Sequence, residues 1–199
     1  MTMRLAALLP TALACMIQQP LAAQDSVTVE PEMPPAEFRI APPGTTMIWT
    51  RLDGYKTERG RIGEVEDMLV HYSWEGQPRR IYLFCIRCGS PDVVFDLAAY
   101  KAIFPLEVGK AVEFPRRIDQ WHWTNRIAVV DTETLRLPFG SVDAYVIQSE
   151  TRGLDNPFHA RNRIWFAPGI GWNVRFQYED SRGVSYAWQA IEFKPPVAH

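Results

Sequence analysis

Hydrophobic and polar residues alternate with a period of two near the C-terminus of this chain. Between residues 172 and 179 the apolar positions are Trp172, Val174, Phe176 and Tyr178. Because a helix would scatter these side chains around its axis, the period predicts a β-strand with all four on one face. The turn-forming residues 180–183 end in glycine, and residues 184–193 are again rich in aromatic and β-branched side chains. The pattern predicts an antiparallel hairpin with an aromatic inner face.

Similar alternation along the rest of the chain predicts about eight to ten short strands. The expected segments are residues 45–52, 61–65, 68–74, 80–86, 111–114, 121–130 and 135–149. Segment 61–65 is weakly apolar and is expected at a sheet edge. The polar residues 152–163 contain glycine, asparagine and proline and predict a long loop. Because strands follow strands, we expect a mainly β fold with antiparallel pairing, either a curved sheet, a half-barrel or a sandwich.

Residues 91–104 are the one segment with the pattern of a helix. Pro91 and Asp92 suit its first turn, and Pro105 suits its end. The side chains expected to pack are Phe95, Leu97, Ala98 and Ile103. The sequence therefore predicts one short helix that plugs or flanks the sheet.

The first 23 residues have the pattern of an export signal. Arg4 precedes an apolar run, residues 5–17, that is too short to span a bilayer. Small residues before Gln24 then offer a cleavage site. A rival interpretation is cleavage before Cys15, with a lipid attached to its thiol. We expect a periplasmic protein, with attachment through Cys15 as the alternative.

Proline punctuates the segment that follows the export signal. Residues 24–44 are expected to form an extended, semi-rigid linker rather than a packed segment. One β-rich domain would then occupy residues 45–194, with residues 195–199 as a tail. This organisation predicts a single domain held on an N-terminal tether.

Composition and charge agree with one folded domain. The chain has 199 residues, of which 47% are hydrophobic and 22% charged, and a formal net charge of −2. This near-neutral balance gives no electrostatic reason to expect binding to nucleic acid. No later segment approaches the roughly 20 apolar residues of a transmembrane helix, so we expect no membrane span.

Three short stretches carry a family resemblance. Residues 104–110 read F-P-L-E-V-G-K, residues 140–147 read G-S-V-D-A-Y-V-I, and residues 165–172 read W-F-A-P-G-I-G-W. Their order and spacing resemble uncharacterised exported proteins and lipoproteins of Gram-negative bacteria. This chain departs from the pattern at Phe139, where a small residue is common. The resemblance implies a β-rich periplasmic protein or lipoprotein and transfers no catalytic residue.

Cys85 and Cys88 form the sharpest local signal for chemistry. In an exported protein, two cysteines so close in sequence favour a disulfide. A thioredoxin-type redox site would need this motif at a helix N-terminus, and the expected helix starts later. A zinc site would need further ligands, for which the chain offers His71, His122, His159 and carboxylates. Gly89 stands where covalent haem attachment requires histidine. We expect a structural disulfide, no metal and no cofactor.

Aromatic residues are the remaining clue to function. The chain has seven tryptophans, seven tyrosines and ten phenylalanines, most of them in expected strands. Most should be core residues, while a few could line a concave face and stack on sugars or lipid chains. The candidate ligand-binding residues are Trp121, Trp123, His159, Arg161, Arg163, Trp165 and Trp172.

Catalytic motifs are missing from the sequence. It has no G-x-S-x-G elbow, H-E-x-x-H motif or glycine-rich phosphate loop. We therefore expect a non-catalytic binding or scaffolding protein of the cell envelope, whose ligand is a lipid, a glycan or a partner protein. The alternative is an enzyme, either a thiol–disulfide redox protein or a hydrolase that uses His159.

Overall fold

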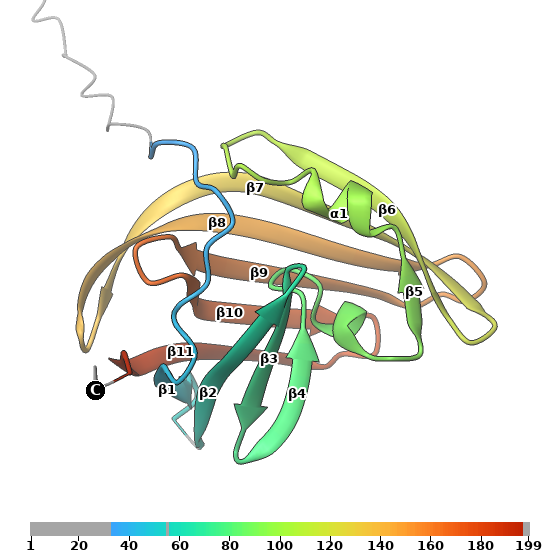
Figure 1. Cartoon of the computed structure of the whole chain (residues 1–199). Coiled ribbons are helices and arrows are strands. Elements are labelled where there is room, and N and C mark those ends of the chain that lie inside the picture. The colour runs from blue at the N-terminus through green and yellow to red at the C-terminus, as the bar shows by residue number, and fades with distance from the viewer. Residues whose placement is uncertain (1–32, 55, 197–199) are drawn as a thin grey trace, which may run out of the picture. The chain divides into compact units, whose positions relative to one another are not determined.

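The computed structural model describes residues 33–54 and 56–196, which lie in one compact unit (Figure 1). Its fold is mainly β, as predicted. The strands are β1 (Thr46–Arg51), β2 (Thr57–Glu66), β3 (Leu69–Trp74), β4 (Gln77–Ile81), β5 (Val93–Phe95), β6 (Ala111–Ile118), β7 (Trp121–Leu137), β8 (Gly140–Gly153), β9 (His159–Ala167), β10 (Trp172–Asp180) and β11 (Ser185–Lys194). Two short helices, η1 (Ile86–Gly89) and α1 (Leu97–Lys101), lie between β4 and β6.

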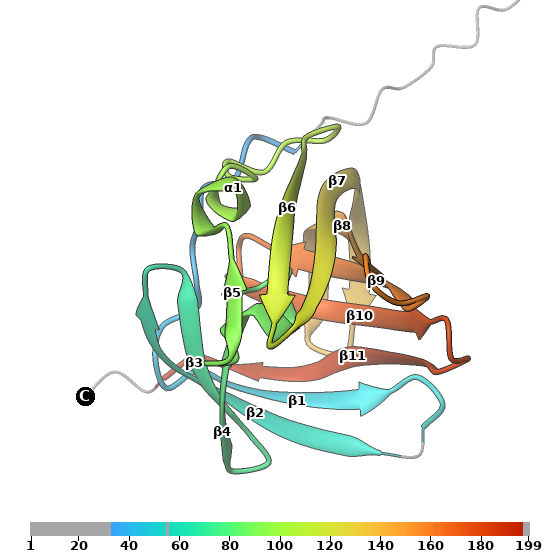
Figure 2. The same ribbon diagram turned by 90° about the vertical axis from the view of Figure 1, so that its right-hand side faces the viewer.

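All eleven strands belong to one antiparallel sheet in the order β4-β3-β2-β1-β11-β10-β9-β8-β7-β6-β5. Most neighbours are consecutive in the chain, so hairpins build most of the sheet. The exception is the pairing of β1 with β11, which joins the first and last strands. Figure 2 shows β6 running crosswise to β10 and β11, because the sheet twists and curves along the strand order. The sheet stays open, with β4 and β5 as its edges.

Buried side chains form two clusters, one on each face of the sheet. The larger cluster contains Ile147 and Phe166, and the smaller contains Val146 and Trp165. Since neighbouring residues of a strand point to opposite faces, each pair separates the two clusters. We call the face that bears the larger cluster the concave face and the opposite one the convex face.

A crossing segment, residues 82–92, carries the chain from the edge strand β4 to the edge strand β5. Leu83 and Phe84 are almost completely buried. Their carbonyl oxygens accept hydrogen bonds from Asn173 Nδ2 (3.0 Å) and Ser149 Oγ (2.8 Å). The phenyl ring of Phe84 also packs edge-on against Phe166, with centroids 5.7 Å apart. The crossing segment therefore packs on the concave face and is held there by two strands.

The helix is shorter than the sequence predicted. Residues 93–95 pair with β6 as strand β5, and only residues 97–101 are helical. The prediction of a helix over residues 91–104 is therefore wrong for its first residues. α1 begins after Asp96, whose Oδ1 accepts a hydrogen bond from the amide of Ala99 (2.9 Å). Tyr100 and Ile103 are fully buried and anchor this turn on the sheet.

Several expected strand boundaries are also wrong. The segment 61–65, expected at an edge, belongs to the ten-residue β2, which pairs with both β1 and β3. The strand expected over 80–86 ends at Ile81, where the crossing segment begins. The expected loop 152–163 is mostly strand, because β8 extends to Gly153 and β9 starts at His159.

The hairpin of β10 and β11 was correctly predicted, except for the face of the sheet to which one side chain points. A bulge in the pairing with β9 lies between Asn173 and Arg175. The extra residue turns Val174 to the convex cluster, while Trp172 and Phe176 belong to the concave side. The expectation that Trp172, Val174 and Phe176 share one face is therefore wrong at Val174.

Residues 33–44 run in an extended conformation and pack on the domain. Ala36 exchanges backbone hydrogen bonds with Leu106, and the amide of Ala41 donates to Gly171 O (3.0 Å). The hydroxyl of Tyr145 donates to Pro34 O (2.6 Å). This part of the expected linker is packed, whereas residues 24–32 lie outside the described residues.

Candidate functional site

A cavity of about 440 Å³ opens on the concave face, in the part of the sheet where β1 pairs with β11. Seven aromatic residues line it, together with three charged residues, one amide and one aliphatic side chain. The aromatic residues are Trp49, Tyr72, Trp74, Trp172, Phe176, Tyr186 and Trp188, and the others are Arg51, Glu58, Arg79, Asn173 and Ile81. We call this cavity the aromatic pocket. It is formed by β1–β4 on one side and by β10 and β11 on the other.

Trp74 is at the centre of the aromatic contacts. Its ring centroid lies 6.2 Å from that of Trp49, 6.4 Å from Tyr72 and 6.1 Å from Trp188. Tyr72 continues the series to Trp172, at 6.1 Å. Such tilted and edge-on pairs are the favourable arrangements for aromatic rings, so the wall of the pocket is a connected aromatic structure.

The strand register explains why these rings gather. Val70, Tyr72 and Trp74 alternate along β3 and therefore point to the same face. On the other side, Trp188 of β11 stands opposite Phe176 of β10. Because β1 lies between β2 and β11, aromatic side chains from distant parts of the chain reach one cavity.

A buried carboxylate fixes part of this wall. Glu58 of β2 is only 7% exposed. It accepts a hydrogen bond from Trp74 Nε1 and forms an ion pair with Lys56 Nζ. The carboxylate is thus satisfied by the protein and holds the indole of Trp74 in place.

Further polar atoms of the pocket are buried without protein partners. Trp49 Nε1, Arg51 Nε and Asn173 Oδ1 find no hydrogen-bond partner within the described part of the chain. Burial raises the pKa of Tyr72, with Arg79 opposing the shift, and burial also raises the pKa of Tyr186. Both phenols therefore stay protonated at neutral pH. The pocket thus combines aromatic rings with polar side chains.

Of the residues that the sequence suggested for ligand binding, only Trp172 lies in the aromatic pocket. Trp121 is 44% exposed in the hairpin of β6 and β7. Trp123, two residues further along β7, packs edge-on against Phe158 with centroids 5.4 Å apart. Arg116 lies over the ring of Trp123 at 5.7 Å. These two tryptophans are therefore separate from the pocket.

The remaining four candidates lie on β9 rather than in a long loop. His159 and Arg161 are exposed and line a different cavity of about 590 Å³, where Arg161 Nε lies 3.3 Å from Glu150 Oε1. Trp165 is buried on the convex face and lies under the guanidinium groups of Arg163 (5.2 Å) and Arg175 (5.3 Å). The structure thus does not bring the seven candidates together.

Sequence reasoning missed most of the aromatic pocket. Tyr72 and Trp74 belong to a segment in which two sets of side chains clearly alternate, and Tyr186 and Trp188 belong to a segment rich in aromatic residues. These patterns identified strands with apolar faces. They held no information on which strands would become neighbours.

Cys85 and Cys88 are joined by a disulfide within the crossing segment. Both residues are buried, at 5% and 3% exposure, and Cys85 Sγ lies 3.9 Å from Arg116 Nη1. Burial lowers the pKa of Arg116 to about 10, and repulsion from Arg87 contributes to this shift. A partner thiol would have to pass through packed protein to reach these sulfur atoms, so the geometry favours a structural disulfide over thiol exchange.

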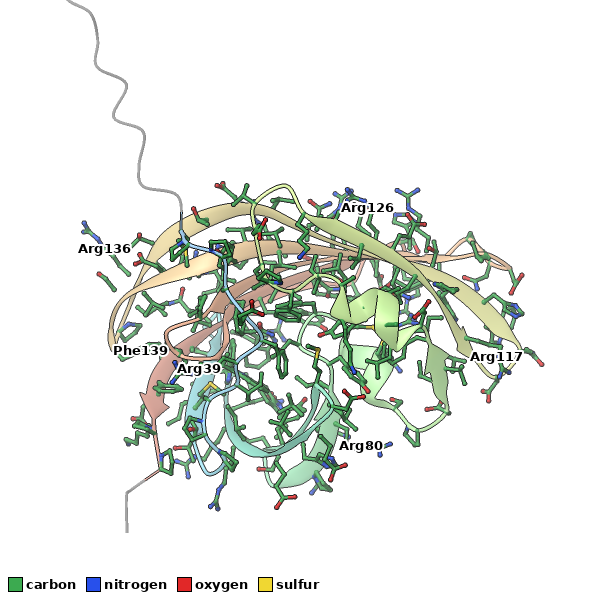
Figure 3. The ribbon with its side chains drawn as sticks, turned by 45° about the horizontal axis from the view of Figure 1, so that its top comes forward. Arg39, Arg80, Arg117, Arg126, Arg136 and Phe139 are labelled. Atoms are coloured by element: carbon green, nitrogen blue, oxygen red, sulfur yellow. A yellow bond between two sulfur atoms is a disulfide. The ribbon has the colours of Figure 1, made fainter. Side chains whose placement is uncertain are left out.

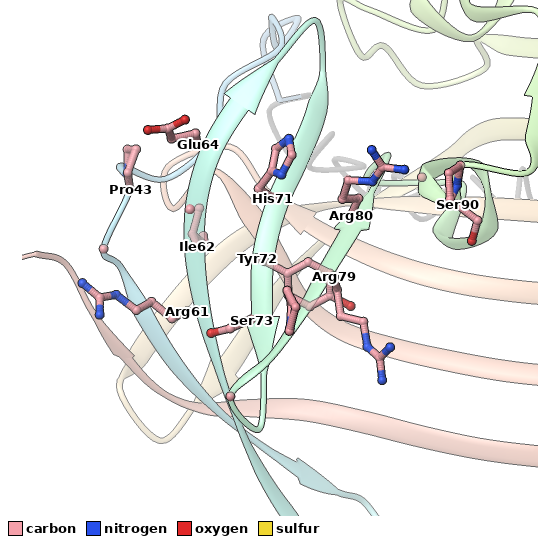
Figure 4. Close-up of a pocket in the computed structure, with 16 residues that line it drawn as sticks. Pro43, Arg61, Ile62, Glu64, His71, Tyr72, Ser73, Arg79, Arg80 and Ser90 are labelled. Carbon is pink, nitrogen blue, oxygen red and sulfur yellow. The ribbon is translucent and has the colours of Figure 1, made fainter.

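A larger cavity, about 790 Å³, lies along β2, β3 and β4. Figure 4 shows Arg61, His71 and Arg80, which these adjacent strands contribute to it. Tyr72 is its one aromatic lining residue. Glycine and proline supply much of this lining. The cavity therefore offers few rings on which a ligand could stack, and we regard the aromatic pocket as the stronger candidate.

Within residues 33–54 and 56–196, no group of three or more His, Cys, Asp or Glu side chains is placed to hold a metal ion. In the same residues no helix has the length and apolarity to cross a membrane.

These features define the class of the molecule as an open antiparallel sheet with an aromatic pocket on its concave face. No protein-family model matches the chain, and no curated protein sequence matches it. Among solved structures it is similar to three proteins from bacteria. The hypothetical lipoprotein YmcC from Escherichia coli K12 is 12% identical, with a TM-score of 0.47, over 80% of this chain and 90% of that one.

Two further similar structures also come from bacteria. A predicted lipoprotein from Parabacteroides distasonis ATCC 8503 is 13% identical, with a TM-score of 0.43, over 81% of this chain and 100% of that one. A predicted exported protein with a YmcC-like fold from Bacteroides fragilis NCTC 9343 is 13% identical, with a TM-score of 0.41, over 80% and 99% of the two chains. All three neighbours are thus described as lipoproteins or exported proteins.

Proposed function

We propose that this protein is a non-catalytic carbohydrate-binding protein of the cell envelope and that the aromatic pocket is its binding site. The observation that carries the proposal is that seven aromatic rings and several polar side chains, among them the exposed Arg79, line one cavity. The cavity volume of about 440 Å³ lies within the range of about 300–1,000 Å³ of small-molecule sites. It suits one or two sugar rings rather than a folded partner protein.

Aromatic rings suit the apolar faces of sugars. Trp74 and Trp188 are both only half-buried, so part of each indole is available to a ligand. Aromatic side chains supply large contact areas with few rotatable bonds, so little conformational entropy is lost on binding. The hydrogen bond from Trp74 to Glu58 adds to this preorganisation.

The polar part of the lining argues against a lipid chain in the pocket. An acyl chain would cover the exposed guanidinium group of Arg79 without giving it a hydrogen bond. A buried donor left without a partner costs about 1–3 kcal/mol, and more when it is charged. Sugar hydroxyl groups both donate and accept hydrogen bonds, so they can satisfy such a group.

The proposal includes the organisation expected from the sequence. Residues 1–23 act as an export signal, residues 24–44 follow it, and the folded domain of residues 45–194 works in the periplasm. Attachment through a lipid on Cys15 is the alternative. Mass spectrometry of the exported protein tests this organisation: an N-terminus at Gln24 supports it, and a lipidated N-terminus at Cys15 contradicts it.

Binding can be followed through the tryptophan fluorescence of the exported protein. The probes are cellohexaose, chitohexaose and, as the lipid probe, palmitate. We expect at least one saccharide to change the emission and to bind about tenfold more weakly to Trp74→Ala, because the central ring is lost. Trp121→Ala is the matched control, since Trp121 lies outside the pocket. Binding of palmitate alone, or an equal loss in both variants, would contradict the proposal.

A further inference from the structure

The charges around the aromatic pocket do not balance. Two guanidinium groups, Arg51 and Arg79, and one carboxylate, Glu58, line it. Arg51 Nη2 forms an ion pair with Asp53 Oδ2 at 2.6 Å, and Glu58 pairs with Lys56. Among the ion pairs within residues 33–54 and 56–196, none involves Arg79. One positive charge is therefore left over at the pocket.

The strand register places that charge beside the aromatic wall. Arg79 of β4 stands directly opposite Tyr72 of β3, so their side chains share the concave face. Arg51 of β1 stands opposite Trp188 of β11 in the same way. Both guanidinium groups therefore line the same cavity as the ring pair formed by Trp74 and Trp188.

We propose that the saccharide bound here is acidic, with a carboxylate that pairs with Arg79 while its ring stacks on the neighbouring tryptophans. This inference rests on the proposed carbohydrate-binding function and names the class of sugar. A guanidinium group can bind a carboxylate through two parallel hydrogen bonds, which fixes the orientation of the sugar ring as well as its charge. Uronic acids carry such a group at C6, next to the ring face that stacks.

Arg51 is less available to such a carboxylate. Its Nη2 already pairs with Asp53 Oδ2, and its Nε is buried out of reach of solvent. Arg79 is exposed, so its pairing with a carboxylate is open to solvent and sensitive to salt.

A matched pair of probes isolates the carboxylate. Methyl β-D-glucuronide and methyl β-D-glucoside differ only at C6, where one has a carboxylate and the other a CH₂OH group. Both are titrated into the exported protein and followed by backbone amide chemical shifts. We expect the glucuronide to bind about three- to tenfold more tightly at about 20 mM salt, and this ratio to fall towards one at about 500 mM salt, because exposed charge pairs are screened.

Two variants connect the preference to Arg79. Arg79→Gln should bring the ratio of the two affinities to about one, since the amide keeps hydrogen-bonding groups but loses the charge. Arg126→Gln is the control, because Arg126 is an exposed arginine that projects from β7 away from the pocket (Figure 3). It should leave the ratio unchanged.

The outcomes separate the two proposals. If the glucoside binds in the pocket and the glucuronide binds no better, the inference of an acidic ligand is wrong while the carbohydrate-binding function stands. If the preference for the glucuronide persists in Arg79→Gln, Arg79 does not cause it and the inference is overturned. The inference is also overturned if acetate displaces the glucuronide at equal concentration, because the site then binds a carboxylate without recognising the sugar. If these two monosaccharides and the two hexasaccharides all fail to shift the pocket resonances, both proposals fall.

Discussion

The indole N–H of Trp74 on β3 donates a hydrogen bond to the buried carboxylate of Glu58 on β2. Trp74 is also the ring that contacts Trp49, Tyr72 and Trp188. One hydrogen bond between neighbouring strands therefore orients the residue on which the aromatic wall is centred. The stability of this region and the shape of the pocket depend on the same contact.

Replacing Glu58 should affect both properties. In Glu58→Ala the indole N–H of Trp74 loses its acceptor, and a donor left without a partner costs about 1–3 kcal/mol of unfolding free energy. Glu58→Gln keeps an acceptor oxygen and should lose less. Urea denaturation of both variants measures the difference. Equal stability of the two variants would show that the hydrogen bond is unimportant.

The crossing segment should contribute strongly to stability. Phe84 is 1% exposed and packs on Phe166, so Phe84→Ala should lower the unfolding free energy by about 3–5 kcal/mol. Ser149→Ala removes the hydrogen bond to the carbonyl of Phe84 and should cost about 1 kcal/mol. Leu154→Ala, at a residue 63% exposed, is the control and should change little. Denaturant unfolding that fails to separate Phe84→Ala from this control would contradict the account.

The disulfide should be protected by burial. Cys85 and Cys88 are almost inaccessible, so dithiothreitol should reduce them in the native protein only as fast as the crossing segment opens. Alkylation followed by mass spectrometry measures this rate with and without urea. Because the disulfide closes a loop of only about four residues, the double variant Cys85→Ala/Cys88→Ala should lose only about 2 kcal/mol. Rapid reduction without denaturant would indicate an accessible redox site instead.

Acid should weaken the hairpin of β10 and β11. Hydrogen bonds from Arg182, Tyr178 and the amide of Val184 lower the pKa of Asp180 below its usual value of 3.8. Since the folded-state pKa is the lower one, the carboxylate stabilises the fold above about pH 4, and this contribution is lost as the pH falls further. Burial, together with the hydrogen bond to the same aspartate and its charge, raises the pKa of Tyr178 to about 12.

The variant Asp180→Asn tests this dependence. Its melting temperature should lie below that of the unmodified protein near neutral pH, and the difference should shrink as the pH falls below about 4. Glu179→Gln, at an exposed neighbouring carboxylate, is the control. A difference between Asp180→Asn and the unmodified protein that does not change with pH would exclude the proposed role of the charge.

Local patterns in the sequence predicted strands well where one face is apolar. β3 and β10 alternate in sequence and β11 is rich in aromatic residues, and the predicted segments match the observed strands closely, although the bulge in β10 turns Val174 to the other face. The pattern failed on β9, because His159, Arg161 and Arg163 are all exposed on this strand and resemble a loop. It also failed around α1, where β5 and one helical turn share a stretch that was read as a single helix.

The sequence by itself determined that this protein is a β-rich domain whose strands carry aromatic faces, because alternation depends only on the backbone of each strand. Only the tertiary structure decided that β1 pairs with β11, and this pairing brings Trp49 and Trp188 into one pocket with Trp74. Strand partners are chosen by burial summed over the whole sheet, and no single strand carries that sum in its own residues. For the same reason Trp172 lies in the pocket while Trp165, only seven positions away, is buried on the opposite face.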